Sequence, residues 1–159
     1  MSLLSPGDPF PTLDVQLVGG SSLTLPEALG GKYGVVLFNR GSWCPFCTGQ
    51  LRQFQRLYER FTAADIEVLS LSVDNEATAA ELVKKNKIDF LVGHSADAPR
   101  LAELTGAFVN TEPSYVQATG FVLDPAGRVV LSTYSSGAIG RLTAEDTLAF
   151  IEHIRQQTH

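Results

Sequence analysis

Hydrophobic and polar positions divide the chain into strand-like runs and helix-like spacings. Residues 35–38 are all apolar and residues 66–73 are mostly apolar, which is typical of strands covered on both faces of a parallel sheet. Between these runs, apolar residues recur at helical intervals at Leu51, Phe54, Leu57, Tyr58 and Phe61. This spacing predicts one amphipathic helix that ends at about residue 61. Strands that alternate with helices predict βαβ crossovers, so the fold class is α/β with a mostly parallel core.

The N-terminal part of the chain has the pattern of a β-hairpin. Apolar and polar residues alternate over residues 13–17 and again over residues 23–25, and Gly19-Gly20 lies between them. Alternation on both sides of a glycine turn predicts two paired antiparallel strands. Residues 26–29 are expected to form one helical turn that ends at Gly30-Gly31.

The later elements follow from similar signals. They are expected at residues 89–92 (strand), 99–105 (helix), 120–123 and 128–134 (hairpin), and from residue 143 onward (helix). Asp74 or Asn75 is placed to cap the helix after the second buried strand. Residues 108–118 have little periodicity, so we predict an irregular segment. It is either part of the mouth of an active site or a plain connection.

The only two cysteines of the chain, Cys44 and Cys47, follow the first buried strand at C-x-x-C spacing. Cys44 is expected at the start of the helix, where free backbone N–H groups and the helix dipole favour thiolate over thiol. Pro45 suits the first helical turn because no N–H is needed there. Cys47 lies three residues on, so it shares a helix face with Cys44 and is expected to be the more buried thiol. Arg40 adds a permanent positive charge nearby.

Two other interpretations of the cysteine pair were weighed against redox chemistry. The first is a pair of buried, inert cysteines, and the second is half of a zinc site. Zinc needs about four ligands, and the three histidines show no ligand spacing: His94, His153 and His159. We therefore favour redox chemistry and expect no metal ligands.

Length and charge limit the class of protein. A chain of 159 residues, 44% of them apolar, is expected to form a single domain over residues 1–159 with a real hydrophobic core. A net charge of −5 without a Lys/Arg cluster argues against nucleic acid and anionic membrane as partners. No signal peptide or membrane-spanning run is recognisable, so the expected location is cytoplasmic. There a C-x-x-C pair indicates redox or metal chemistry rather than a structural disulfide.

Residues 40–47 read R-G-S-W-C-P-F-C, which resembles the R-G-x-W-C-P-x-C motif of peroxiredoxin-like proteins in the AhpC/TSA group of the thioredoxin superfamily. Residues 7–11, 72–74 and 121–129 resemble other parts of the same family, so the similarity covers nearly the whole chain. It implies a thioredoxin-like fold, in which a central mixed sheet is flanked by helices and carries an N-terminal β-hairpin extension.

The chain departs from the usual peroxiredoxin pattern P-x-x-x-T-x-x-C. Leu37 stands at the proline position and Gly41 at the threonine position. The arginine that commonly precedes the late strand has no counterpart either. Ser42 is the candidate replacement for the threonine, and Arg40 or Arg141 for the arginine.

The resemblance implies a thiol peroxidase with no bound metal or organic cofactor. Cys44 attacks a hydroperoxide and becomes a sulfenic acid, and Cys47 condenses with it to a disulfide. A thioredoxin-like or glutaredoxin-like reductant then resets the pair. The other candidate site residues are Arg40 and Ser42 in catalysis and Trp43, Pro45, Thr119 and Arg141 in substrate binding.

Two alternatives stay open at this level. One is a protein thiol-disulfide reductase or oxidase without peroxidase turnover, whose substrate is a disulfide. The other is a non-enzymatic redox sensor whose oxidation alters a partner interface. The sequence is compatible with a monomer or a homodimer.

Overall fold

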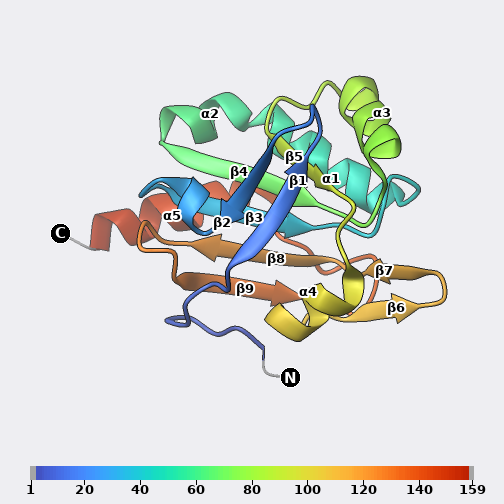
Figure 1. Cartoon of the computed structure of the whole chain (residues 1–159). Helices are drawn as coiled ribbons and strands as arrows, with labels where there is room; N and C mark the ends of the chain where they lie inside the picture. The colour runs from blue at the N-terminus through green and yellow to red at the C-terminus, as the bar shows by residue number, and fades with distance from the viewer. Residues whose placement is uncertain (1–2, 158–159) are drawn as a thin grey trace.

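The computed structural model describes residues 3–157 and is organised around β3 (Tyr33–Phe38), whose six residues are all buried. On one side β3 pairs in parallel with β4 (Ile66–Leu71), and on the other it pairs antiparallel with β8 (Thr119–Leu123). The sheet has seven strands (Figure 1), in the order β2 (Ser22–Leu25), β1 (Leu13–Leu17), β5 (Leu91–His94), β4, β3, β8 and β9 (Val129–Tyr134). The expected fold class, a central mixed sheet flanked by helices, is therefore confirmed.

The remaining elements are four more strands of this sheet, the two strands of a separate small sheet, and the helices. The strands are β1 (Leu13–Leu17), β2 (Ser22–Leu25), β5 (Leu91–His94), β6 (Val109–Thr111), β7 (Ser114–Val116) and β9 (Val129–Tyr134). The helices are α1 (Pro45–Arg56), α2 (Tyr58–Ala63), α3 (Glu76–Asn86), α4 (Ala98–Thr105) and α5 (Ala144–Gln157), with a 3₁₀ turn at Glu27–Leu29.

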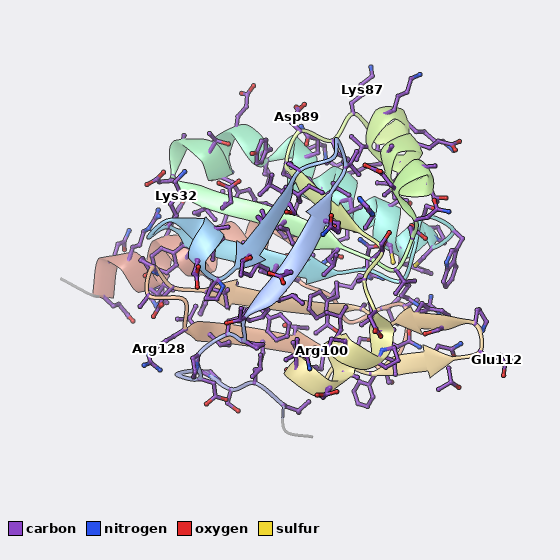
Figure 2. All side chains as sticks on the ribbon, viewed as in Figure 1. Lys32, Lys87, Asp89, Arg100, Glu112 and Arg128 are labelled. Carbon is purple, nitrogen blue, oxygen red and sulfur yellow. The ribbon has the colours of Figure 1, made fainter. Side chains whose placement is uncertain are left out.

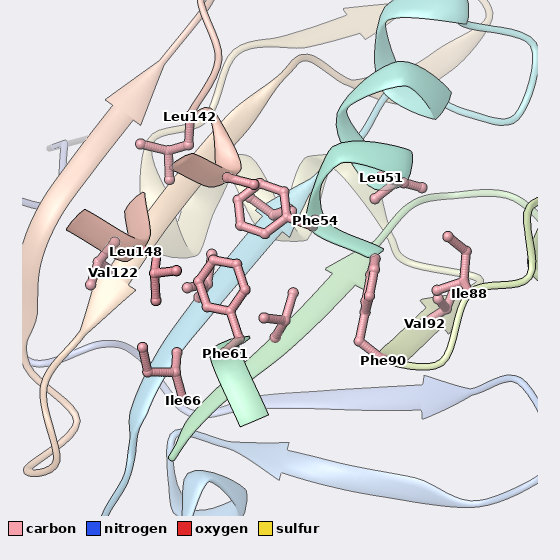
Figure 3. Close-up of a cluster of buried hydrophobic side chains, with 14 of the residues drawn as sticks. Leu51, Phe54, Phe61, Ile66, Ile88, Phe90, Val92, Val122, Leu142 and Leu148 are labelled. Atoms are coloured by element: carbon pink, nitrogen blue, oxygen red, sulfur yellow. The ribbon is translucent and has the colours of Figure 1, made fainter. Parts of the chain in front are cut away.

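One face of the sheet is covered by α1, α2, α3 and α5. Val35 and Leu37 of β3 point into this layer because alternate residues of a strand face opposite sides. They pack there with Phe54 of α1, Phe61 of α2 and Leu148 of α5, and part of this cluster is drawn in Figure 3. The burial fixes the start of α1 against the end of β3.

The opposite face of the sheet carries a second apolar cluster, to which the N-terminal segment, the β1–β2 hairpin and α4 contribute side chains. Val36 and Phe38 of β3 point into this second cluster, and Phe121 of β8 packs edge-to-face against both Phe10 and Phe38. The expected hairpin is confirmed, and β1 also pairs antiparallel with β5. The hairpin is thus an extension of the main sheet.

The prediction of a single helix ending at about residue 61 is wrong, because α1 ends at Arg56 and α2 begins at Tyr58. In an uninterrupted helix, Phe54 and Phe61 would be about 10 Å apart along the axis. The change of direction at Leu57 instead lets their rings stack with centroids 5.4 Å apart. Core packing has overridden a continuous helical pattern here.

Two further predictions need correction. Residues 108–118 are not irregular, because β6 and β7 form a two-stranded hairpin there. The strand expected at residues 89–92 begins two residues later, at Leu91.

Of the two candidate caps for α3, Asn75 is the one used, and its Oδ1 accepts the N–H of Thr78 at 2.9 Å.

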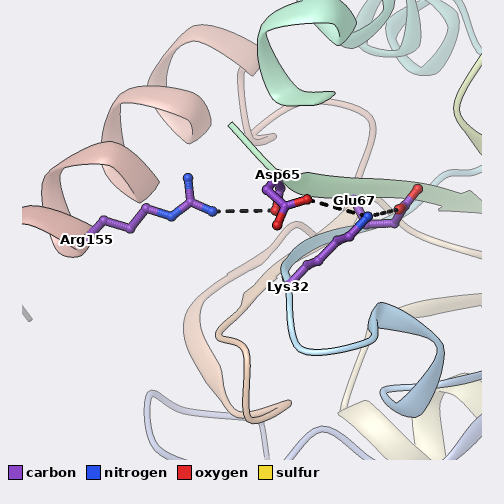
Figure 4. A network of polar contacts seen from close by, with 4 residues as sticks. All are labelled: Lys32, Asp65, Glu67 and Arg155. Carbon is purple, nitrogen blue, oxygen red and sulfur yellow. Dashed lines mark hydrogen bonds and ion pairs between the residues drawn. The ribbon is translucent and has the colours of Figure 1, made fainter. Parts of the chain in front are cut away.

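The outer surface carries exposed charged side chains such as Lys87, Glu112 and Arg128 (Figure 2). Lys32 pairs with Asp65 at 3.6 Å and with Glu67 at 3.9 Å, and Arg155 donates to the Asp65 carbonyl (Figure 4). Exposed contacts of this kind each contribute roughly 0–1 kcal/mol to stability. None of the helices in residues 3–157 has the length and apolar character needed to cross a membrane.

Candidate active site

The two cysteines lie where the chain leaves the carboxyl end of β3 and enters α1. Cys44 is the N-cap residue of α1, and its sulfur accepts the backbone N–H of Cys47 at 3.3 Å. Pro45 follows as the first helical residue. The expected position of Cys44 at the helix start is confirmed, and its sulfur replaces the side-chain oxygen that usually caps a helix.

Both cysteines are reduced and fully buried, each with an exposed fraction of 0%. Neither cysteine has exposed surface, but Cys47 is enclosed by protein atoms more deeply than Cys44, so the expectation that it is the more buried thiol is confirmed. Two hollows of about 340 Å³ flank the cysteine turn and share Pro45, but neither is lined by a cysteine. An oxidant can reach the sulfurs only past the side chains that cover them.

Arg40 brings its guanidinium to Cys44, with Nη1 3.7 Å from the sulfur. The other guanidinium nitrogens are held by the β6–β7 region, because Nε donates to Oε1 of Gln117 at 3.0 Å and Nη2 donates to the Tyr115 hydroxyl at 3.1 Å. The ring of Trp43 lies beneath the same guanidinium at 4.8 Å. Arg40 is thus fixed beside the sulfur and does not point into solvent.

Arg141 lies between β9 and α5, far from the cysteines in sequence, but its side chain reaches both sulfurs. Its Nη2 is 2.8 Å from the sulfur of Cys47 and 3.8 Å from that of Cys44. Nη1 donates to Oε1 of the buried Gln50 at 2.7 Å. Each sulfur therefore has a guanidinium beside it.

These contacts separate the acidities of the two thiols. Burial by itself raises the pKa of Cys44, but hydrogen bonds from Cys47 and Arg40 and the charge of Arg141 outweigh it, so this pKa falls below the ordinary thiol value. Burial also raises the pKa of Cys47, and the neighbouring Cys44 sulfur raises it further. The directions agree with the expectation that Cys44 is the more acidic thiol.

The other predicted site residues lie around this centre in different ways. Ser42 is held through its backbone N–H, which donates to Oδ2 of Asp74 at 2.8 Å. Trp43 is 55% exposed and packs edge-on against the Tyr115 ring. Thr119 is buried beside Phe38, and its hydroxyl donates to the Gln117 carbonyl rather than to a sulfur.

Sequence reasoning missed four residues that hold the site: Gln50, Asp74, Tyr115 and Gln117. A signal existed for Gln50, a polar residue three positions after Cys47 on the inner face of the helix. Tyr115 and Gln117 fall in the segment that was a candidate for the mouth of the site. Among residues 3–157, no three or more His, Cys, Asp or Glu side chains are grouped closely enough to hold a metal ion.

Comparison with known proteins shows the family to which this sequence is similar. Residues 6–132 match the AhpC/TSA family. The chain belongs to the AhpC/TSA family. This AhpC/TSA protein is 30% identical over 141 residues to a peroxiredoxin of Methanothermobacter thermautotrophicus, covering 85% of this chain and 66% of the relative. It is also 30% identical over 139 residues to a peroxiredoxin of Chlorobaculum tepidum, covering 85% of this chain and 65% of the relative. The chain thus spans slightly less than two thirds of the length of these curated relatives.

Solved structures agree on the fold of the AhpC/TSA protein. Mycobacterium bovis AhpC superposes with a TM-score of 0.82 at 21% identity, covering 99% of this chain and 96% of that one. A mutant of Xylella fastidiosa PrxQ superposes with a TM-score of 0.82 at 18% identity, covering 98% of this chain and 99% of that one. The thioredoxin-like fold and the resemblance to peroxiredoxin-like proteins are both confirmed.

Arg40→Met is expected to raise the pKa of Cys44, because it removes a hydrogen bond and a charge that favour the thiolate. At a pH below the new pKa less thiolate is present, so alkylation should slow at neutral pH and recover as the pH rises. The measurement is the rate of iodoacetamide alkylation against pH in a Cys47→Ser background. Arg100→Met, which removes an exposed arginine paired with Glu103, is the control. An unchanged midpoint in Arg40→Met would show that Arg40 does not act on the thiolate.

Proposed function

We propose that this AhpC/TSA protein is a thiol peroxidase in which Cys44 is the nucleophile and Cys47 the resolving cysteine. The observation that carries the proposal is the pair of guanidinium groups within 3.8 Å of the Cys44 sulfur. Fixed positive donors stabilise a thiolate, and they also stabilise negative charge that develops on an oxygen during bond cleavage. Arg40 and Arg141 would thus serve both the nucleophile and the departing oxygen.

The proposed reaction has three steps. The Cys44 thiolate attacks the nearer oxygen of a hydroperoxide, the O–O bond breaks, and an alcohol or water leaves after protonation. The Cys44 sulfenic acid then condenses with Cys47, which forms the disulfide and releases water. A thioredoxin-like or glutaredoxin-like dithiol reduces the disulfide by exchange. None of these steps needs a bound metal or organic cofactor.

Burial favours a hydroperoxide over a protein disulfide as the oxidant. Both sulfurs are completely covered in the reduced state, so a small oxidant needs less rearrangement to reach Cys44 than a disulfide on a polypeptide does. Trp43 and Pro45, both exposed beside Cys44, would border the path of that oxidant. Ser42 would hold the turn through the hydrogen bond from its backbone N–H to Asp74, and Thr119 would support the end of β3, where it pairs with Phe38. We propose the cytoplasm as the location, where such reductants are found.

The test is stopped-flow oxidation of the reduced protein by hydrogen peroxide, an organic hydroperoxide and a model disulfide. The only tryptophan of the chain, Trp43, lies next to Cys44, so its fluorescence reports on the site without a label. We expect both peroxides to react faster than the model disulfide. A faster reaction with the disulfide would favour the disulfide reductase. Negligible turnover with every reductant would favour the redox sensor.

A further inference from the structure

Arg141 is closer to Cys47 than to the proposed nucleophile. Its Nη2 lies 2.8 Å from the Cys47 sulfur and 3.8 Å from the Cys44 sulfur. The side chain of Arg40 shows the opposite preference, because the hydrogen bond from its Nη1 goes to Cys44. The Arg40 side chain thus contacts only the Cys44 sulfur, whereas Arg141 contacts both sulfurs and lies closer to the one that must attack second.

The orientation of Arg141 is set by groups other than the sulfurs. Its Nε donates to the Ala138 carbonyl at 2.6 Å and its Nη1 donates to Gln50 Oε1 at 2.7 Å. Gln50 is 6% exposed and lies one helical turn after Cys47, and its own Nε2 donates to the Leu142 carbonyl at 2.9 Å. Because these contacts do not involve Cys44, Arg141 can stay in place after Cys44 has reacted.

The charges that face Cys47 change when Cys44 is oxidised. In the reduced protein, burial and the neighbouring Cys44 sulfur raise the pKa of Cys47, whereas the Arg40 backbone N–H and the Arg141 guanidinium lower it. A sulfenic acid or mixed disulfide on Cys44 carries no thiolate charge. The repulsion then disappears while Arg141 remains, so Cys47 ionises more readily after Cys44 has reacted.

We infer that Arg141, oriented by Gln50, is a positioning residue that holds Cys47 ready to attack as a thiolate and close the Cys44–Cys47 disulfide. The inference rests on the proposed function, in which Cys47 resolves. In the closing step the Cys47 thiolate forms the S–S bond, the S–O bond of the Cys44 sulfenic acid breaks, and hydroxide leaves and is protonated to water. Both electrons of the broken bond leave with the oxygen, so no further oxidant or reductant is needed.

The closing step can be measured without peroxide. Methyl methanethiosulfonate, a small reagent, converts the Cys44 thiolate to a methyl disulfide and releases methanesulfinate. Attack by Cys47 then forms the Cys44–Cys47 disulfide and releases methanethiolate, so acid-quenched intact-mass spectrometry follows the loss of the methylthio group. We expect Arg141→Met to slow this loss roughly tenfold at neutral pH, because a charge-assisted hydrogen bond to the attacking sulfur is removed.

The pH profile separates this role from a structural one. The rate of closure in Arg141→Met should rise to wild-type level at high pH, because Cys47 then ionises without help. Arg141→Lys should recover part of the neutral-pH rate. Gln50→Leu keeps the charge of Arg141 but removes the hydrogen bond that orients it, so this variant should slow closure less than Arg141→Met does. Arg100→Met should have no effect. The labelling step should slow less than closure, since Arg40 still faces Cys44.

Closure at the wild-type rate in Arg141→Met, or slow closure at every pH, would overturn the inference. Failure of the proposed function is a different result. In that case wild type would close the disulfide after methylthio labelling yet would not react with hydrogen peroxide.

Discussion

Cys44→Ser is expected to reduce the rate of hydrogen peroxide consumption by about a thousandfold or more, as removal of a catalytic nucleophile does in other enzymes. A serine hydroxyl in the same place is not ionised at neutral pH, and its oxygen cannot store the oxidised state that sulfur holds as a sulfenic acid. The measurement is peroxide consumption with a dithiol reductant, together with the Trp43 fluorescence change in a single turnover.

The fold should survive this substitution. Cys44 is the N-cap of α1, and serine is among the residues preferred at that position. Circular dichroism and the urea unfolding midpoint should therefore remain close to those of wild type. The matched control is Cys47→Ser, which keeps the nucleophile and should still react once. If Cys44→Ser reacted with peroxide and Cys47→Ser did not, the two roles would be reversed.

Cys47→Ser is expected to stall after one oxidation and then to become overoxidised. One equivalent of peroxide should add one oxygen to its mass, whereas wild type should lose two hydrogens and both free thiols as the disulfide forms. With excess peroxide the variant should gain a second oxygen, because no neighbouring thiol captures the sulfenic acid before it reacts again. Wild type should resist this step, since closure competes with the second oxidation.

Intact-mass spectrometry of both proteins after a peroxide titration distinguishes the disulfide of wild type from the oxygen adducts of Cys47→Ser. The geometry supports closure because Cys47 lies on the next turn of the same helix and its backbone N–H already contacts the Cys44 sulfur. Thr48→Ser, a conservative change one residue further along α1, is the control for disturbance of the helix start. A wild type that accumulated sulfenic acid with Cys47 still free would remove Cys47 from the mechanism.

Together, the variants of Cys44, Cys47, Arg40 and Arg141 test how the two guanidinium groups act on the two sulfurs. In the proposed mechanism, the Arg40 side chain contacts the sulfur that would react first, and Arg141 lies closest to the sulfur that would react second. Loss of Arg40 should therefore slow oxidation, and loss of Arg141 should slow closure. Separate effects on the two rates would therefore support the proposed order of the two chemical steps.

Local features of the site could be predicted from the sequence because they depend on neighbours within a few residues. The apolar run that became β3, the N-cap position of Cys44, the place of Pro45 and the shared helix face of Cys44 and Cys47 all follow from strand and helix periodicity and from helix-end chemistry. The resemblance of residues 40–47 to one family added the thioredoxin-like fold. The local features were confirmed because the interactions that determine them lie within a short stretch of chain, and the fold is confirmed by its likeness to the solved structures.

Where prediction failed, distant packing had decided the structure. The helical pattern continues through Leu57, but the stacking of Phe54 on Phe61 favours two helices. Residues 108–118 have little periodicity of their own, yet they contain the β6–β7 hairpin, and Tyr115 of β7 and Gln117 just after it hold Arg40.

The sequence by itself determined a cysteine pair at the start of a helix that follows a buried strand, because backbone periodicity and capping are local. Only the tertiary structure decided which side chains surround that pair. Arg141 is more than 90 positions from either cysteine along the chain, and it reaches them because β8 and β9 pair beside β3 and α5 packs against α1. That packing decides which guanidinium groups lie beside each sulfur, since spacing in a sequence carries no information on distances across the fold.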